Sequence, residues 1–380
     1  ALVQKLQRWQ RARAGKGQAV LLEGEAGIGK SRISKALFDA ALGETYTPVR
    51  LQCSPYHSDT ALWPISQFLR HKAGLQGGES AVEARAKVRQ ALGESDAAAN
   101  QLLASLMGVQ ATGGPAQDLS PRLQRARTLE ALTDRLRAMS RERPVLMLIE
   151  DIHWIDPTTW ELVEGWLEEI VDERVMMLMT RRPDTGLAPA PDMLDLAHLT
   201  HIELSRLRPS GGRAIVEGLA PGVLPEETVD AIITRTDGVP LFVEELTKAV
   251  VETGETSIPA SLQDTLMARL DQFHDVKEIA QTASALGREF SHRLLAAVAG
   301  KPEAELNAAL GKLAAAEIVF PQGSGEERRY AFKHALVLDA AYHSLLKTRR
   351  QALHGRIFQT LEARFGEVAE RQPEVLARHA

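Results

Sequence analysis

The sequence is poor in cysteine. Cys53 is the only one among 380 residues. A single thiol excludes a disulfide framework, and it also excludes a metal site built from cysteine thiolates. One buried thiol is typical of a protein in a reducing compartment, so we expect a cytoplasmic location.

Long apolar runs are absent as well. The longest, Val145–Ile149 and Val175–Met179, are far shorter than the roughly 20 residues that a membrane-spanning helix needs, so we expect no membrane partner. No signal peptide is visible at the N-terminus. Leu2, Leu6 and Trp9 instead have the spacing of the later part of a helix. We therefore expect the chain to be a piece of a longer protein.

Charge of one sign is not in excess. The chain has 45 basic and 50 acidic residues and a net charge of −5, which gives no global reason to expect a nucleic-acid partner. The hydrophobic share of 44% and the charged share of 25% are those of ordinary globular domains. A chain of this length is expected to form two or three of them.

The most informative segment present is a glycine-rich loop, residues 24–31, which reads G-x-x-x-x-G-K-S. An apolar run, Ala19–Leu22, precedes it, and Ile33 and Leu37 follow at helical spacing. Glycines let backbone N–H groups surround phosphate oxygens, and the next helix directs its positive end at the same anion. The lysine reaches the outer phosphates and the serine hydroxyl holds Mg²⁺. The residues expected to bind nucleotide here are Gly24, Glu25, Ala26, Gly27, Ile28, Gly29, Lys30, Ser31 and Arg32.

Two carboxylates and an arginine complete the expected site. Glu150 and Asp151 end the apolar run Val145–Ile149, where a buried strand delivers side chains to the ligand edge of an open α/β sheet. One carboxylate is expected to orient Mg²⁺ and the other the attacking water. The order Glu-Asp leaves open which of the two residues binds the metal. Arg182 follows another strand candidate and is expected to sense the terminal phosphate.

Alternating strand and helix signals predict an α/β fold with a mostly parallel sheet and helices on both faces. We expect an ATPase domain over 1–205, with a helical insertion at about 54–119. Short helices punctuated by prolines follow over 206–255. Helices and a hairpin, the recipe for a winged helix, follow over 256–345. The strand candidates are Ala19–Leu22, Val49–Cys53, Val145–Ile149, Val175–Thr180 and His201–Leu204.

Taken together, the motifs resemble those of the STAND class of P-loop ATPases, the signal-transduction ATPases with numerous domains. The segments that carry this resemblance are GEAGIGKSR (24–32), LIEDIHWIDPTT (148–159), TRRPD (180–184), GVPLFVEEL (238–246) and YAFKHAL (330–336). The segment LQCSPYHSDTALWPI (51–65) and the stretch 327–362 look most like the modules attached to bacterial class III adenylate or guanylate cyclases. Similar modules occur in LuxR-type transcriptional activators.

The resemblance implies a nucleotide switch. In the family, a proline corresponding to Pro240 touches adenine and a histidine corresponding to His334 approaches the β-phosphate of ADP. ADP would hold an ATPase domain, a helical lid and a winged helix closed, and ATP would release them for self-association. The resemblance also implies attached output domains and the start of a TPR-like helical region over 346–380.

Hydrolysis is expected to be slow, because the acidic pair runs Glu150-Asp151 rather than Asp-Glu and the shorter Asp151 reaches water less well. The main alternative function is an ATP-dependent, LuxR-type DNA-binding regulator. Against it, the expected wing, residues 322–329, reads QGSGEERR and has no clear phosphate-binding face, so nucleic acid is not the expected partner of this fragment. A scaffold that binds ATP without cleaving it, and a metabolic kinase, are further alternatives.

Overall fold

The structure is a computed structural model with two compact units, which are described separately. The first comprises Ala1–Glu25 and Gly29–Leu204, and the second comprises Ala26–Ile28 and Ser205–Ala380. The predicted domain boundaries within these units stay predictions. The residues described are 2–41, 44–55, 57–75, 79–93, 96–109, 119–183, 194–253, 266–267, 270, 274–322, 328–333, 335–365, 376–377 and 379.

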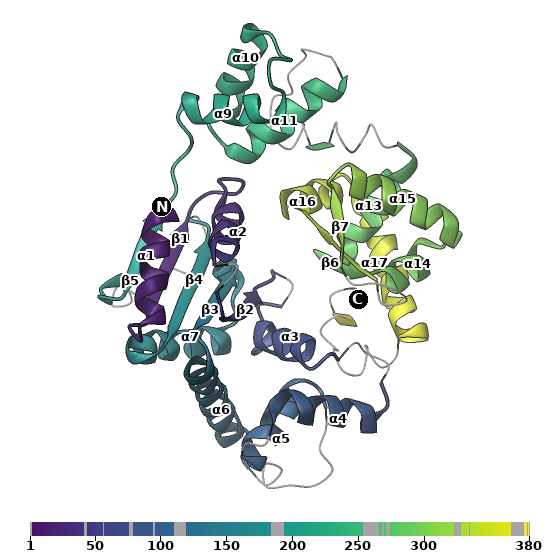
Figure 1. The fold of residues 1–380 in the computed structure, drawn as a ribbon. Coiled ribbons are helices and arrows are strands. Elements are labelled where there is room, and N and C mark those ends of the chain that lie inside the picture. The colour runs from purple at the N-terminus through teal and green to yellow at the C-terminus, as the bar shows by residue number, and fades with distance from the viewer. Residues whose placement is uncertain are drawn as a thin grey trace. The chain divides into compact units, whose positions relative to one another are not determined.

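A five-stranded sheet organises the first unit (Figure 1). Every neighbouring pair of strands is parallel, which confirms the predicted α/β fold with a parallel sheet. The strand candidates of the sequence all fall on these strands. Their order across the sheet is β2 (Thr47–Gln52), β3 (Val145–Glu150), β4 (Val175–Arg181), β1 (Gln18–Glu23) and β5 (Leu199–Glu203).

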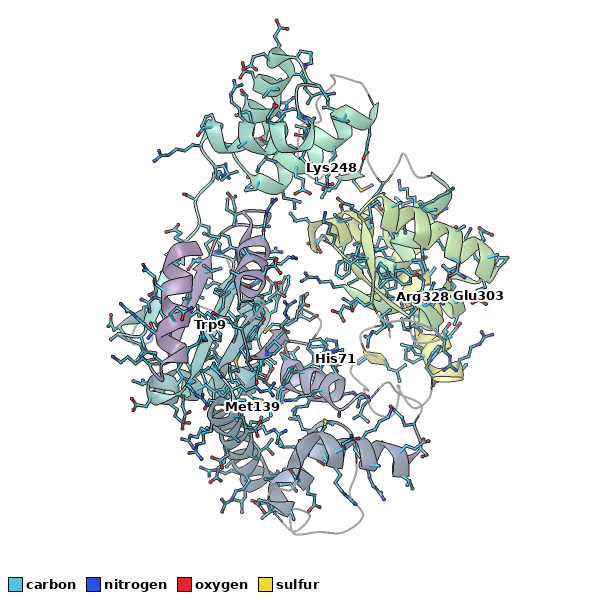
Figure 2. The ribbon with its side chains drawn as sticks, viewed as in Figure 1. Trp9, His71, Met139, Lys248, Glu303 and Arg328 are labelled. Atoms are coloured by element: carbon cyan, nitrogen blue, oxygen red, sulfur yellow. The ribbon has the colours of Figure 1, made fainter. Side chains whose placement is uncertain are left out.

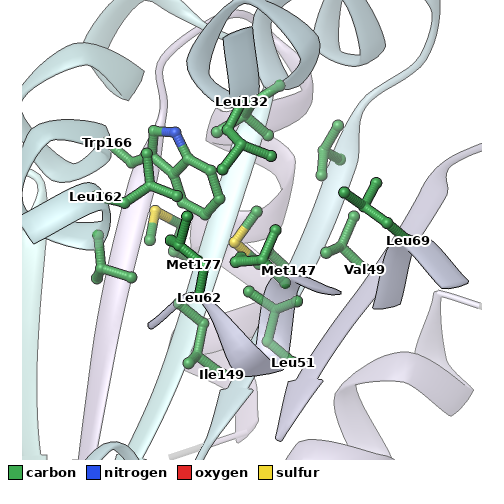
Figure 3. Close-up of a cluster of buried hydrophobic side chains, with 14 of the residues drawn as sticks. Val49, Leu51, Leu62, Leu69, Leu132, Met147, Ile149, Leu162, Trp166 and Met177 are labelled. Carbon is green, nitrogen blue, oxygen red and sulfur yellow. The ribbon is translucent and has the colours of Figure 1, made fainter. Parts of the chain in front are cut away.

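Helices cover both faces of this sheet, because alternate strand residues point to opposite sides. On one side, Val20 and Leu22 pack with Trp9 of α1 (Leu2–Arg13) and Leu37 of α2 (Lys30–Ala40) (Figures 1 and 2). On the other side, Met147 and its neighbours pack against α6 (Pro121–Glu142) and α7 (Pro157–Glu169) (Figure 3). Both faces are apolar, which explains why the interior strands β1, β3 and β4 read as hydrophobic runs.

The described part of the predicted insertion, at about 54–119, includes helices. It contains α3 (Trp63–Lys72), α4 (Ala81–Leu92) and α5 (Ala97–Leu106). Residues 110–118, near its expected flexible tip, lie outside the described residues. The following helix α6 starts at Pro121, because the Ser120 hydroxyl accepts a hydrogen bond from the Leu123 N–H at 3.4 Å and Pro121 fills the first helical position.

Asp156 caps α7 and is 1% exposed. Its carboxylate accepts hydrogen bonds from the N–H groups of Thr159 at 2.8 Å and Leu62 at 3.1 Å, and from the Thr159 hydroxyl at 2.5 Å. The cap therefore joins α7 to the start of α3.

Replacing Asp156 with alanine leaves two buried N–H donors unpaired, so we expect the first unit to lose about 2–4 kcal/mol of stability. Urea denaturation followed by tryptophan fluorescence measures this loss. All five tryptophans (9, 63, 154, 160 and 166) belong to the first unit. The matched control is Asp96→Ala at the exposed cap of α5, where we expect about 1 kcal/mol or less. Equal losses in the two variants would contradict the joining role of Asp156.

The second unit contains two groups of helices. α9 (Pro209–Leu219), α10 (Glu226–Thr236) and α11 (Pro240–Thr253) share one hydrophobic core. A second core lies among α13 (His274–Leu286), α15 (Glu303–Ala315), α16 (Ala335–His343) and a small antiparallel sheet. Two further helices among the described residues of this unit are α14 (His292–Ala299) and α17 (Lys347–Arg364).

The small sheet has the strand order β6 (Glu289–Ser291), β8 (Arg329–Phe332) and β7 (Val319–Gln322). β7 and β8 are the predicted hairpin, and their antiparallel pairing confirms it. The sequence analysis missed β6, because three residues are too few to show an alternating pattern.

A cluster of lysines and glutamates ties α11 to the start of β7. The Lys248 ammonium donates to carboxylate oxygens of Glu244 at 2.8 Å and Glu317 at 2.6 Å, and Lys333 donates to the same oxygen of Glu317 at 2.9 Å. These two lysine hydrogen bonds lower the pKa of Glu317 to about 2. The carboxylate of Glu317 therefore stays charged at neutral pH and connects the two helical groups of this unit.

Candidate phosphate-binding site

The glycine-rich loop lies between the interior strand β1 and helix α2. Gly27 and Gly29 have φ angles of 80° and 103°, in the left-handed region that side chains disfavour. Gly29 is the N-cap of α2, and no side chain caps the helix. The first N–H groups of a helix lack partners within the helix, so this end is suited to an anion.

Lys30 is the first residue of α2 and is buried. Its ammonium donates to the carbonyl oxygens of Gly24 at 2.5 Å and Glu25 at 3.0 Å. Burial lowers the pKa of Lys30 to about 8, against the opposing effect of Asp151, while Arg182 lowers the pKa further. The lysine is thus held inside the loop as a cation at neutral pH, in electrostatic reach of Asp151 and Arg182.

The other loop residues differ in how far they are exposed. Ser31 and Arg32 are exposed on the first turn of α2, and Ile28 is 5% exposed. The carboxylate of Glu25 raises the pKa of Lys30, so its charge also reaches the ammonium. Ala26 precedes the positive-φ glycine within the turn.

The acidic pair lies at the carboxyl end of β3. Glu150 is the last strand residue and shares a face with Leu146 and Leu148, the face that α2 covers. Asp151 has a φ of 57°, and its N–H donates to the hydroxyl of Thr180 on the neighbouring strand β4 at 3.0 Å. This hydrogen bond fixes the direction in which the chain leaves the sheet.

The two arginines at the carboxyl end of β4 differ in their surroundings. Arg181 is buried, and its guanidinium lies 3.3 Å from a carboxylate oxygen of Glu23 on β1. The guanidinium carbon of Arg182 lies 5.2 Å from the centre of the Trp154 ring, a cation–π contact. Arg182 is therefore the arginine that Trp154 steadies beside the acidic turn.

His153 belongs to the 3₁₀ turn η1 (Ile152–Trp154), which follows Asp151. Burial is the main cause that lowers the pKa of His153 to about 4, while Asp151 opposes the shift and Arg182 and Lys30 add to it. The imidazole is therefore neutral at physiological pH. Its ring centre lies 4.3 Å from that of Trp154.

The predicted adenine and ADP contacts stay predictions. Pro240 is the first residue of α11 in the second unit. In that unit the N–H of the next residue, Leu241, donates to the carbonyl oxygen of Gly27 at 3.2 Å. His334 lies outside the described residues.

The residues present fit a magnesium nucleotide. The loop offers backbone N–H groups, one ammonium and one hydroxyl, and the acidic pair offers the hard oxygen ligands that Mg²⁺ prefers. Sequence reasoning missed Thr180, His153 and Trp154 as parts of this site. Thr180 is the first residue of the TRRPD segment, and His153 and Trp154 come within three residues of Asp151. Only the fold shows what each of these side chains contacts.

Along the part of the chain that the structure describes, no helix combines the length and apolarity required to cross a membrane.

Comparison with known proteins supports an ATPase. Residues 2–178 match the family model of the AAA ATPase domain. The chain is 29% identical over 396 residues to protein R02095 of Rhizobium meliloti (strain 1021), which carries the description uncharacterized. That alignment covers 98% of this chain and 38% of the relative, so the chain spans less than half of it.

The solved structures that match this chain include the Aeropyrum pernix ORC1 protein in complex with DNA, at 15% identity and a TM-score of 0.41. That alignment covers 90% of this chain and 91% of the ORC1 chain. Thermotoga maritima RuvB T158V is similar at 14% identity and a TM-score of 0.36. That alignment covers 85% of this chain and 88% of the RuvB chain. The glycine-rich loop and the acidic pair both lie within the matched family residues. Residues 2–178 are thus similar to AAA ATPase domains.

Proposed function

We propose that this chain is a regulatory switch that binds ATP and hydrolyses it slowly. One observation carries the proposal. The buried Lys30, held by the glycine loop, lies within electrostatic reach of both Asp151 and Arg182, which come from the ends of two other strands. An ammonium, a carboxylate and a guanidinium gathered at a helix N-terminus suit a polyphosphate and its metal ion.

Each residue has a distinct role in the proposed reaction. Lys30 would leave the carbonyls of Gly24 and Glu25 and bind the outer phosphates. The hydroxyl of Ser31 and a carboxylate of the acidic pair would hold Mg²⁺, which would neutralise phosphate charge. Arg182 would stabilise the charge that develops on the terminal phosphate.

The finer assignment is to the STAND class, with ADP closing and ATP opening the protein. Pro240 would contact adenine, His334 would contact ADP, and the small sheet with its helices would act as a winged helix that moves between states. A bound nucleotide shifts such an equilibrium only by its different affinity for the two states. The greater length of the Rhizobium relative supports the presence of output domains outside this chain, which the ATP state would control by self-association.

Single-turnover and multiple-turnover hydrolysis assays with Mg²⁺-ATP test this function. We expect a rate of about 10⁻² per second or less, as in other nucleotide switches, and none after EDTA removes the metal. Limited proteolysis with ADP and with a non-hydrolysed ATP analogue should give different fragments. Rates of about 1–100 per second, as kinases have, would contradict the switch while leaving the ATPase in place.

A further inference from the structure

The imidazole of His153 lacks hydrogen-bond partners. Both of its ring nitrogens are buried, and neither has a partner among the described residues. A buried polar group without a partner destabilises the folded protein, so native proteins rarely leave one unsatisfied. Such a group commonly marks a place where a ligand or a reacting water supplies the missing hydrogen bond.

The position of His153 identifies that place. Asp151, Arg182 and Lys30 all act on its ring electrostatically, and these are the groups that would surround the terminal phosphate and the metal. The indole of Trp154 contacts the imidazole of His153 and also makes the cation–π contact with Arg182. One side chain therefore positions both His153 and Arg182. The ring is therefore held rigidly at the reacting end of the candidate site.

Water can supply a hydrogen bond that the ring of His153 lacks. An imidazole nitrogen that carries a lone pair accepts a hydrogen bond, and water can donate one, whereas an ionised phosphate oxygen only accepts. The Asp151 carboxylate, which is short and lies in the field of Lys30, is then available to the metal.

We infer that His153 positions the water that attacks the terminal phosphate, an inference that rests on the proposed function. The lone pair of the imidazole accepts a hydrogen bond from that water and directs its oxygen at the γ-phosphorus. A bond forms between this oxygen and phosphorus, and the bond from phosphorus to the bridging oxygen of ADP breaks. ADP leaves with the electron pair, and the proton of the water passes to the released phosphate. His153 orients the water and keeps its own protonation state.

Replacing His153 with phenylalanine tests this role, because the ring that packs on Trp154 is kept and both nitrogens are lost. We expect hydrolysis to fall by about 10-fold or more, with the affinity for ADP unchanged within about twofold. Calorimetry should show a similar loss, about 10-fold, in the affinity for ADP with aluminium fluoride, which imitates the transferring phosphate. His153→Gln, which can still donate and accept, should recover part of both. His71→Phe on the exposed end of α3 is the control and should change neither (Figure 2).

Three results would overturn the inference. The first is hydrolysis of ATP by His153→Phe at the parent rate with normal ADP binding, which would leave the proposed function standing. Both His153 variants could lose ADP affinity in step with hydrolysis, which would make the residue purely structural. If the parent protein takes up neither ADP nor ATP, the proposed function fails and the inference fails with it.

Discussion

Replacing Lys30 with alanine is expected to weaken ATP binding by about 100-fold. The glycine loop encloses this ammonium, which donates to the carbonyls of Gly24 and Glu25. With nucleotide bound, we expect these donors to serve phosphate oxygens, and a hydrogen bond to a charged group contributes about 1.5–3 kcal/mol. That energy corresponds to roughly a 10- to 100-fold change in affinity. Isothermal titration calorimetry with nucleotide-free protein measures it.

Lys35→Ala is the matched control, because Lys35 lies on the same helix but pairs with Asp39 on its exposed side, 2.6 Å away. We expect no change in ATP affinity in this variant. The parent protein should also bind ATP less well as the pH rises through about 8, because the free lysine then loses its proton. Unchanged affinity in Lys30→Ala would refute the loop as the phosphate site.

Replacing Asp151 with asparagine is expected to slow hydrolysis by about 100-fold while ATP still binds. The carboxylate is the acidic group whose charge reaches both Lys30 and His153, so its removal disturbs the reacting end of the site most directly. Asparagine has nearly the same shape and tolerates the left-handed backbone that Asp151 adopts. The substitution therefore tests charge rather than folding.

Glu161→Gln is the control for this experiment, since Glu161 is an exposed residue of α7 that pairs with Arg125. It should hydrolyse ATP at the parent rate. Glu150→Gln completes the series, and its comparison with Asp151→Asn at varied Mg²⁺ shows which carboxylate holds the metal. If Asp151→Asn keeps the parent rate and Glu150→Gln does not, the metal and water roles belong to Glu150.

Much of the fold was predictable because it depends on local patterns. A strand buried on both faces must be apolar throughout, so β1, β3 and β4 stand out as hydrophobic runs. The start of α6 was predictable because capping by Ser120 is a contact between residues three positions apart. The glycine loop was predictable for the same reason, since its function is carried by adjacent residues.

The missed parts of the site depend on contacts between distant segments. Thr180 matters because strands β3 and β4 lie side by side, which brings its hydroxyl to the N–H of Asp151. The contact of Trp154 with Arg182 also crosses between those strand ends. Nothing near His153 in the chain indicates that both ring nitrogens would be buried without partners. Such features follow from tertiary packing, which periodicity and spacing do not encode.

The order of the parallel strands determines which parts of the proposed nucleotide switch are expected to move. β3, β4 and β1 are adjacent, and continuous ladders of hydrogen bonds join them. The loop, the acidic turn and Arg182 therefore follow strands that are hydrogen-bonded to one another in one sheet. In the proposed switch, loss of the terminal phosphate is expected to leave these strands nearly in place. Any conformational change would then occur in segments outside the sheet, where fewer hydrogen bonds have to break.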